Sequence, residues 1–427
     1  MTEFGGADEK ISLKLLAKHC VDACVRGCKE IRAVAKRNKR VMDDDGNFAM
    51  KKEKIKHTFK DENDARSALT EADVNAQSVI IGALRKSYGE RLNIVGEEDG
   101  DANAKPREDE EKLRDDCFEF SKMEEVEDVE VRVGDCVVFV DPVDGTREFI
   151  EERYQNCQCL IGIAHKGRAV VGVVGIPFPK GKITKDCDVE ALAVVYGMCY
   201  EKEDEGGTVV RVLETCNETL LGNAVAAAAT TIALAETTKT KTTKTPTTNQ
   251  QQQQKKQRVS SETTTPSSPY ILTTGDSKSK ALRAAVEVVE ECIRDDNAYP
   301  TPPERLITGG AGNKILRVAT GISPSSSSSQ QTPPTTTTPN DPSKQTKNAP
   351  PDCALMHMGT CAWDTAAPEA VLRASGGTVT DLFGSRLVYD CSNKNEAYVN
   401  ARGVLASSKR TVESGLHDVF CQKNEGK

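Results

Sequence analysis

The sequence lacks both a long hydrophobic run and an excess of basic residues, and each absence argues against one class of protein. No apolar stretch is long enough to cross a bilayer, and residues 1–10 are polar and acidic, without the apolar core of a signal peptide. The formal net charge of −8 argues against a general nucleic-acid binder, which would normally carry a basic surface. We therefore expect a cytoplasmic protein with neither a membrane nor a nucleic acid as its partner.

Cysteine and histidine are present, but not in the spacing that zinc sites and disulfide frameworks use. The 15 cysteines form no Cys-x-x-Cys turn, and the five histidines are scattered along the chain. Cys20, Cys24 and Cys28 recur at helical spacing beside apolar residues, so we interpret them as small buried hydrophobic residues on one helix face. These patterns favour a reducing compartment.

Polar low-complexity sequence separates two parts that are apolar enough to fold. Residues 8–222 predict an N-terminal α+β domain, and residues 270–427 predict a C-terminal α/β domain. Between them, residues 223–269 contain a run rich in threonine, lysine and glutamine, and residues 322–351 form a serine-, threonine- and proline-rich stretch inside the second domain. Such runs cannot bury enough apolar surface to offset their ordering entropy, so we predict two surface insertions that are disordered over 237–269 and 323–351.

Hydrophobic periodicity places the expected elements within these two domains. The first domain should contain helices at 11–38 and 70–85, with Val74 facing inward, and a largely antiparallel sheet; its expected strands are 136–140, 160–164, 169–174 and 191–199. The acidic stretch 100–130 is predicted to be a solvated loop in which 110–121 is compatible with a helix. The second domain should contain strands at 270–273 and 378–382 and helices at 280–292, 313–320 and 365–374.

The strongest local motif is Asp-Pro-Val-Asp-Gly-Thr from Asp141 to Thr146, directly after the apolar run 136–140. Its proline and glycine predict a turn, which would let Asp141 and Asp144 converge instead of pointing to opposite faces of a strand. Thr146 is expected to begin a short helix whose free N–H groups point to the same place. Two such carboxylates beside a helix N-terminus can hold a hard cation and a phosphate together, although an ordinary acidic turn has the same pattern.

Three further acidic motifs indicate a metal site only when they are considered together. Glu97 lies in the turn 96–99, Asp364 lies at the expected entrance of a helix, and Asp73 lies in the first turn of another. Alone, each is explained by capping or by a solvated loop. Together with the 141–146 motif they meet the requirement of a two-metal phosphatase, in which cations hold mutually repelling carboxylates in place. The scattered histidines favour Mg²⁺ over zinc as the cation.

In this order and spacing, the motifs resemble those of the lithium-sensitive inositol monophosphatase superfamily, and most closely its 3'(2'),5'-bisphosphate nucleotidase branch. The resemblance covers nearly the whole chain outside the two insertions and the acidic loop. The motifs of the superfamily are 69–73, 96–99, 141–146 and Trp363-Asp364, and those of the nucleotidase branch are Arg147-Glu148, 160–164, 309–314 and Pro368-Glu369.

The resemblance implies a fold, a reaction and a set of site residues. The fold would be a layered α-β-α-β-α sandwich. The reaction would be removal of the 3'-phosphate of 3'-phosphoadenosine 5'-phosphate, or of its 5'-phosphosulfate analogue, with two or three Mg²⁺ ions and inhibition by lithium. The implied metal ligands are Glu97, Asp141, the Val143 carbonyl, Asp144 and Asp364. Asp73 and Thr146 would orient and deprotonate the attacking water, and the implied substrate contacts are Gly145, Thr146, Thr274, Gly310 and Lys314.

The chain departs from the nucleotidase branch directly after its Thr-Thr strand. There the branch carries an arginine and a histidine, whereas this sequence continues from Thr274 as Gly-Asp-Ser-Lys. Lys278 restores some positive charge and Asp276 opposes it, so the substrate stays open. An inositol phosphate phosphatase is the alternative enzyme, because the metal core would be shared. A non-catalytic nucleotide-binding sensor and a partner-recruiting role for the insertions also remain open, as does the oligomeric state.

Overall fold

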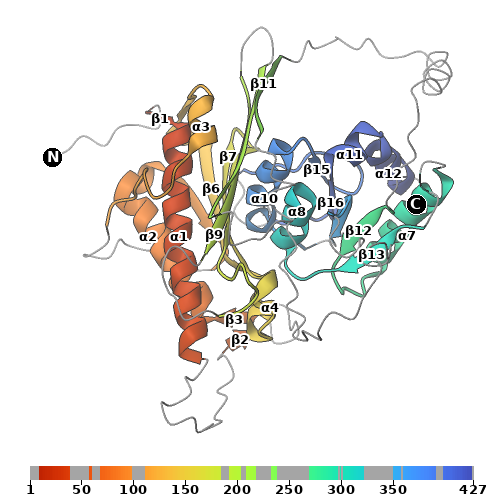
Figure 1. The fold of residues 1–427 in the computed structure, drawn as a ribbon, viewed down its shortest axis with the longest axis horizontal. Helices are drawn as coiled ribbons and strands as arrows, with labels where there is room; N and C mark the ends of the chain where they lie inside the picture. Colours follow the sequence, from red (N-terminus) through yellow and green to blue (C-terminus); the bar gives the residue numbers. More distant parts are fainter. Residues whose placement is uncertain are drawn as a thin grey trace, which may run out of the picture.

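Helices and strands alternate in layers across the molecule in the computed structural model of the chain (Figure 1). The structure describes residues 9–38, 57–59, 68–98, 111–183, 192–202, 208–217, 232–237, 269–296, 299, 302–321, 350–356, 359–390 and 398–425. Most of the two predicted insertions, and the end of the turn at 96–99, therefore lie outside the described residues.

Two long helices, α1 (Leu13–Asn38) and α2 (Glu71–Tyr88), pack together as the first layer. The predicted start of the first helix was wrong by two residues, because Ile11 belongs to a short strand, β1 (Lys10–Ser12), which pairs with β5 (Glu130–Arg132). The second helix begins where Thr70 caps it, preceded by a two-stranded ribbon of β2 (His57–Phe59) and β3 (Ala68–Thr70). Val74, expected to face inward, is 41% exposed.

The second layer is a large sheet against which the first layer packs. Within the described residues it has seven strands in the order β11-β10-β9-β8-β7-β6-β4. All neighbours are antiparallel except β4 and β6, which confirms the expected largely antiparallel sheet. In chain order the strands are β4 (Asn93–Gly96), β6 (Cys136–Asp144), β7 (Gln158–His165), β8 (Arg168–Ile176), β9 (Ala193–Glu201), β10 (Thr208–Cys216) and β11 (Ile232–Thr237). The last of these lies inside the range predicted as the first insertion.

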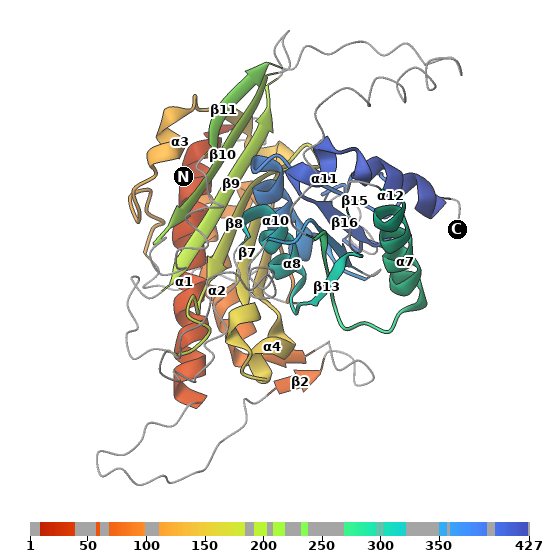
Figure 2. The ribbon, with the colours of Figure 1, turned by 45° about the vertical axis from the view of Figure 1, so that its right-hand side comes forward.

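Helices α8 (Ala311–Thr320) and α10 (Ala362–Ala374) form the third layer, on the other face of the large sheet (Figure 2). Glycines allow α10 to approach closely, because a Cβ atom on Gly172 would lie 1.9 Å from the Ala367 carbonyl oxygen, and one on Gly162 would lie 2.5 Å from the Ala367 nitrogen. Side chains at these sheet positions would push the helix away. The glycines therefore set how deeply α10, which carries Asp364, sits on the sheet.

A smaller sheet and three outer helices complete the layers. Among the described residues this sheet has five strands in the order β13-β12-β14-β16-β15, and β12 pairs in parallel with β13 and β14. Its strands are β12 (Ile271–Thr274), β13 (Glu304–Ile307), β14 (Cys353–Met356), β15 (Thr378–Thr380) and β16 (Val404–Ser407). The outer helices are α7 (Lys280–Asp295), α11 (Lys409–Glu413) and α12 (Leu416–Glu425).

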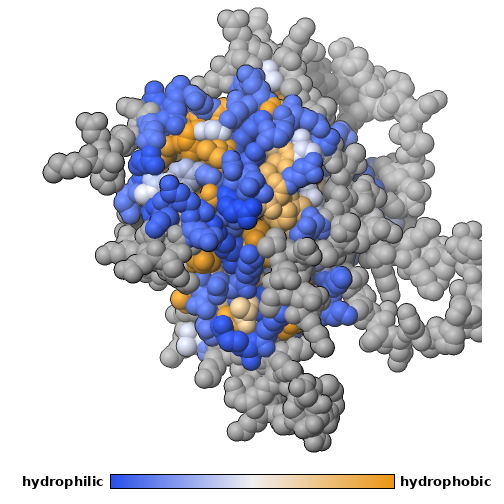
Figure 3. Space-filling model, turned by 60° about the vertical axis from the view of Figure 1, so that its left-hand side comes forward, coloured by the Kyte–Doolittle hydropathy of each residue, from blue (hydrophilic) through white to orange (hydrophobic). Residues whose placement is uncertain are grey.

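The observed layers confirm the predicted α-β-α-β-α sandwich. Residues 111–120 are irregular, as expected of a loop, and a short helix, α3 (Ser121–Glu125), begins only after them. Leu113, Phe120 and Met123 are buried in the first core, so apolar anchoring holds this stretch down despite its acidic composition. Hydrophilic residues cover most of the coloured face in Figure 3, with apolar patches between them. No helix among the described residues combines the length and apolar character needed to cross a membrane.

Candidate active site

Two of the acidic residues lie at the end of β6, where the strand is irregular. The predicted turn at the proline was wrong, because β6 continues through Asp144 and instead shifts register against β7 between Asp141 and Asp144. Such a bulge changes the alternation of side chains along a strand. It brings the two carboxylates together as the predicted turn would have done. Gly145 then ends the strand at φ +90°, and α4 (Thr146–Ile150) begins directly after it.

The first turn of α8 holds Asp144. The backbone N–H of Ala311 donates to Asp144 Oδ1 at 2.7 Å, and that of Asn313 donates to Asp144 Oδ2 at 3.0 Å. These donors are the unpaired N–H groups of a helix start, where negative charge is favoured. Gly310 precedes them at φ +74°, and a Cβ atom there would lie 2.6 Å from Asp144 Oδ2. The glycine-rich turn therefore lets the backbone of the C-terminal half reach the carboxylate.

Asp364 reaches the same place from the start of α10. The prediction put this residue at the helix entrance, but the cap is Cys361, and Asp364 is the third residue of the helix. Its Oδ2 accepts a hydrogen bond from the Cys361 N–H at 2.5 Å. Asn400 donates to the Cys361 carbonyl at 3.2 Å and to Thr365 Oγ1 at 3.3 Å. These bonds fix the first turn of α10, and with it the direction of the carboxylate.

Glu97 follows β4, which runs parallel to β6 on the edge of the large sheet. Its N–H donates to the Val140 carbonyl at 2.9 Å, which ties the turn to the strand that carries Asp141. Gln77 of α2 holds the next residue, because its side chain accepts from the Glu98 N–H at 3.0 Å and donates to the Glu98 carbonyl at 2.8 Å. The turn is thus part of the folded core and is not the solvated loop that its acidity alone would suggest.

Crowding of negative charge is the main electrostatic feature of this site. One carboxylate oxygen from each of Asp141, Asp144 and Asp364 lies within 4.8 Å of the others. Burial and then the charge of Glu97 raise the pKa of Asp141 well above its ordinary value, and the same two causes, with Asp144, raise the pKa of Asp364 to about 8. Carboxylates that repel in this way favour a cation between them.

The donor set fits a hard divalent cation. Asp141 Oδ1 is buried and, among the described residues, receives no hydrogen bond. A buried oxygen left without a donor is costly, and a metal ion would satisfy it. The available ligands are carboxylate and carbonyl oxygens, which suit Mg²⁺ better than zinc. The assignment of Glu97, Asp141, Val143, Asp144 and Asp364 as metal ligands nevertheless stays a prediction.

Asp73 and Thr146 form a second functional pair beside the acidic cluster. Thr146 Oγ1 lies 2.9 Å from Asp73 Oδ1 and 3.1 Å from the Val143 carbonyl oxygen. Asp73 is fully buried, and its other oxygen accepts from the Thr70 N–H at 2.8 Å. Burial raises the pKa of Asp73 to about 6, although the bonds from Thr70 and Thr146 act in the opposite direction. The structure therefore joins a carboxylate and a hydroxyl from segments 73 residues apart.

The expected substrate contacts lie along the first turn of α8 and the end of β12. Lys314 is buried and donates to the Gly310 carbonyl at 2.6 Å, and its charge acts on Asp144. Thr274 is buried at the end of β12, and Arg305 of β13 donates to its Oγ1 at 3.2 Å. Arg305 is a positive group that the sequence analysis missed, since it is 31 residues away along the chain. Only the pairing of β13 with β12 places it beside Thr274.

A further polar network between the two halves was also missed. Asn313 donates to Asn156 Oδ1 at 3.2 Å, and Gln158 donates to Asn313 Oδ1 at 3.2 Å. Glu148, which is buried, accepts from Asn156 and from Arg153, both at 2.7 Å. The glycine-rich sequence before α8 signalled a special backbone there, but no sequence pattern pointed to these side-chain partners. They fix the position of the Asn313 N–H that donates to Asp144.

Comparison with known proteins points to one family. The model of the inositol monophosphatase family matches residues 16–322 and 352–425. The proteins named 3'(2'),5'-bisphosphate nucleotidase 1 in Rattus norvegicus and Homo sapiens are each 28% identical to this chain over 345 residues, covering 79% of this chain and 78% of each relative. The protein of the same name in Dictyostelium discoideum is 37% identical over 113 residues, covering 26% of this chain and 35% of that protein.

Similar solved structures come from bacteria. CysQ from Bacteroides thetaiotaomicron, described as a bacterial member of the inositol monophosphatase family, matches with a TM-score of 0.46 at 16% identity, covering 93% of this chain and 98% of that chain. An IMPase from Thermotoga maritima matches with a TM-score of 0.43 at 14% identity, covering 94% of this chain and 96% of that chain.

Proposed function

The chain belongs to the inositol monophosphatase family and is a phosphatase enzyme, and on that premise we propose that it is a Mg²⁺-dependent 3'-nucleotidase. Its substrate would be 3'-phosphoadenosine 5'-phosphate, or the 5'-phosphosulfate analogue, and its products from the former would be AMP and phosphate. We further propose that it acts in the cytoplasm as part of sulfur metabolism and that lithium inhibits it.

One observation carries the metal-dependent reaction: carboxylates from two layers converge next to a buried Asp–Thr pair, whose aspartate comes from a third layer. Asp141 and Asp144 come from the large sheet, Asp364 comes from α10, and Asp73 comes from α2. The fold brings them together at the cost of mutual repulsion, and structures retain such repulsion mainly at functional sites. A phosphatase has a use for this arrangement, because it must gather cations around an anionic substrate.

Hydrolysis would need two groups of residues, one that binds Mg²⁺ and one that accepts the proton of the attacking water. Glu97, Asp141, Asp144, Asp364 and the Val143 carbonyl would hold Mg²⁺, which when bound neutralises the carboxylates, attracts the phosphate and makes a water molecule more acidic. Thr146, whose hydroxyl proton bonds to Asp73, keeps lone pairs that can accept a proton from the attacking water. Asp73 can receive that proton through Thr146, and its pKa of about 6 suits a base working near neutral pH.

The phosphate itself would be held by N–H groups of the N-terminal half and by positive groups of the C-terminal half. The N–H groups of Gly145 and Thr146, where β6 ends and α4 begins, suit a phosphate anion. Lys314 lies against Gly275, the residue after Thr274, since a Cβ atom there would be 3.6 Å from Lys314 Cε. Gly310 would allow the close approach of backbone and phosphate that a larger residue blocks.

Which phosphate ester is the substrate depends on the charged side chains around the acidic cluster and Thr274. Arg147 donates to Asp276 at 2.9 Å, and both are exposed. Asp276, in the segment where the nucleotidase branch carries positive charge, thus pairs with Arg147. Arg305 beside Thr274 supplies a positive group for a second phosphate, which favours the bisphosphate nucleotide. The neutralised Arg147 favours the alternative, an inositol phosphate phosphatase.

A substrate panel tests the proposal. Purified full-length chain would be given 3'-phosphoadenosine 5'-phosphate, its 5'-phosphosulfate analogue and inositol monophosphates, each with and without Mg²⁺, and released phosphate would be measured. We expect the fastest release from the bisphosphate nucleotide and only with Mg²⁺. Faster release from inositol phosphates would assign the alternative, and nucleotide binding without any turnover would indicate a sensor.

A further inference from the structure

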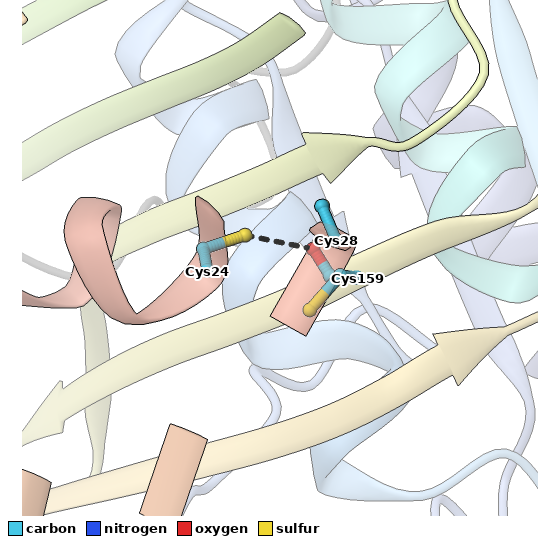
Figure 4. A group of neighbouring side chains, drawn as sticks. All are labelled: Cys24, Cys28 and Cys159. Carbon is cyan, nitrogen blue, oxygen red and sulfur yellow. Dashed lines mark hydrogen bonds between the residues drawn. The ribbon is translucent and has the colours of Figure 1, made fainter. Parts of the chain in front are cut away.

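Three cysteine sulfurs converge in the core between α1 and the large sheet. Cys24 and Cys28 come from α1, and Cys159 comes from β7, the strand that α1 covers (Figure 4). Their Sγ atoms all lie within 4.8 Å of one another, and all three residues are 0% exposed. The sequence analysis identified the two helix cysteines as buried but had no means of placing the third beside them.

The backbone of the neighbouring strand makes room for these sulfurs. Gly175 of β8 is the cross-strand partner of Cys159. A Cβ atom on Gly175 would lie 2.5 Å from Cys28 Sγ and 2.6 Å from Cys24 Sγ, so any other residue would collide with both sulfurs. The hydrogen bond from Cys24 Sγ to the Cys159 carbonyl, 3.6 Å long, is the dashed line in Figure 4. A carbonyl oxygen therefore also faces the group.

We propose that Cys24, Cys28 and Cys159 form a site for one thiophilic metal ion, separate from the active site. Because no two of the sulfurs are more than 4.8 Å apart, an ion at their centre lies at most roughly 2.8 Å from each, and small side-chain rotations bring this to the roughly 2.3 Å of a metal–thiolate bond. Thiolate sulfur selects soft cations such as Cu(I) or Zn²⁺ and has little affinity for Mg²⁺. The two sites would thus bind different ions without competition.

A divalent ion would leave one net negative charge at this site, and a buried arginine lies close enough to offset it. The ion replaces three thiol protons, which leave to solvent, and no electron is transferred. Three thiolates with one divalent cation carry a charge of −1. Arg32, one helical turn beyond Cys28, is 2% exposed and donates to the Pro177 carbonyl. Its positive charge lowers the pKa of Cys28 against the larger effect of burial, so it already acts on this group and would offset the remaining charge.

Because the sulfurs are enclosed, the ion has to enter while the chain folds. The test therefore supplies Cd²⁺, a soft probe ion, in the medium in which the full chain is produced. The purified protein is then washed with EDTA to remove metal from exposed oxygen ligands. Elemental analysis gives Cd²⁺ per chain, and near-ultraviolet absorption reports sulfur-to-cadmium charge transfer.

We expect one Cd²⁺ per chain with strong charge-transfer absorption. The substitutions Cys28→Ala and Cys159→Ala should each reduce the bound Cd²⁺ at least tenfold. The matched control is Cys20→Ala, since Cys20 is also buried in α1 but lies outside the triangle, and it should bind as the unsubstituted chain does. Gly175→Ala keeps all three thiols and should also lose the ion.

Two outcomes would overturn the site: unsubstituted chain without charge-transfer absorption, or Cys28→Ala with absorption unchanged. The three thiols would then be core-packing groups only. If the alanine variants fail to fold, X-ray absorption of the unsubstituted protein decides alone, because it counts the sulfur neighbours of cadmium. Three sulfurs support the site, and fewer than three refute it.

Discussion

The oxygen cluster (Asp141, Asp144 and Asp364) and the sulfur cluster (Cys24, Cys28 and Cys159) are built alike, yet burial has opposite consequences for them. Each combines residues of a helix with residues of the large sheet. Burial raises the pKa of Asp141, Asp144 and Asp364, and repulsion from neighbouring carboxylates raises it further at Asp141 and Asp364. Thiols are neutral and pack like small apolar groups, so Cys24, Cys28 and Cys159 rest in the core without conflict. The carboxylate cluster therefore needs a cation to offset its repulsion, whereas the thiols can pack with or without one.

Replacing one charged ligand of the oxygen cluster should have the largest effect on the rate of phosphate release. Asp144→Asn keeps one oxygen as acceptor for one of the two N–H groups, of Ala311 or of Asn313, leaves the other N–H group facing an NH2, and removes the charge that a cation needs. We expect phosphate release to fall at least about a thousandfold, equivalent to ~4 kcal/mol of transition-state stabilisation. Circular dichroism should show an unchanged fold. A variant with more than a tenth of normal turnover would remove Asp144 from the metal site.

Asp73→Asn should separate proton transfer from cation binding. The amide can still accept from Thr146, but it cannot take up a proton from water. We expect kcat to fall by about 10²–10⁴-fold while Mg²⁺ affinity changes little. Steady-state kinetics and calorimetric titration of Mg²⁺ on the same preparation give both values. Loss of Mg²⁺ binding with intact kcat at saturating Mg²⁺ would reverse the two roles.

Cation removal should destabilise the oxygen cluster and leave the sulfur cluster unaffected. Mg²⁺ at about 100 times its dissociation constant stabilises the folded state by ~2.7 kcal/mol, because it binds the folded form alone. The melting temperature should therefore rise by several degrees on addition of Mg²⁺ to EDTA-treated protein. The control is Asp141→Asn, in which Mg²⁺ should give a much smaller rise. Equal shifts in both proteins would mean that the ion acts elsewhere.

Gly310→Ala tests how closely the backbone of α8 must approach Asp144. The substitution strains a positive φ and puts a methyl carbon 2.6 Å from Asp144 Oδ2. We expect a loss of about 1–3 kcal/mol in the free energy of unfolding together with reduced turnover. Gly89→Ala is the matched control, since Gly89 has φ +62° but no atom within 4 Å of an added Cβ. It should lose stability without losing activity per folded molecule.

The smallest effect is expected from the sulfur cluster. Cys28→Ala should leave phosphate release within about twofold, because no catalytic group contacts this sulfur, and should lower the unfolding free energy by about 1 kcal/mol. Urea denaturation and the substrate assay measure the two quantities. A tenfold loss of activity would show that the two clusters are coupled through β7.

Sequence reasoning was most successful where each residue type has a distinctive local role. The acidic motifs at strand ends and helix starts predicted which carboxylates meet, and the apolar run of β6 predicted the strand that carries two of them. The reasoning failed where the outcome depends on pairing between distant segments. A bulge against β7 replaces the predicted turn, Arg305 reaches Thr274 only through the pairing of β13 with β12, and Cys159 reaches the helix cysteines only through layer packing. Local patterns contain no information on such contacts.

Carboxylates that lie far apart in the sequence bind the same group of cations in this account. Asp364 provides the best test, because it lies in the other half of the chain from Asp141. Calorimetric titration of Mg²⁺ into the full-length chain and into Asp364→Asn measures this directly. The account predicts saturable binding to the unsubstituted protein and at least tenfold weaker binding to a folded variant. Equal affinity in the two proteins would contradict it.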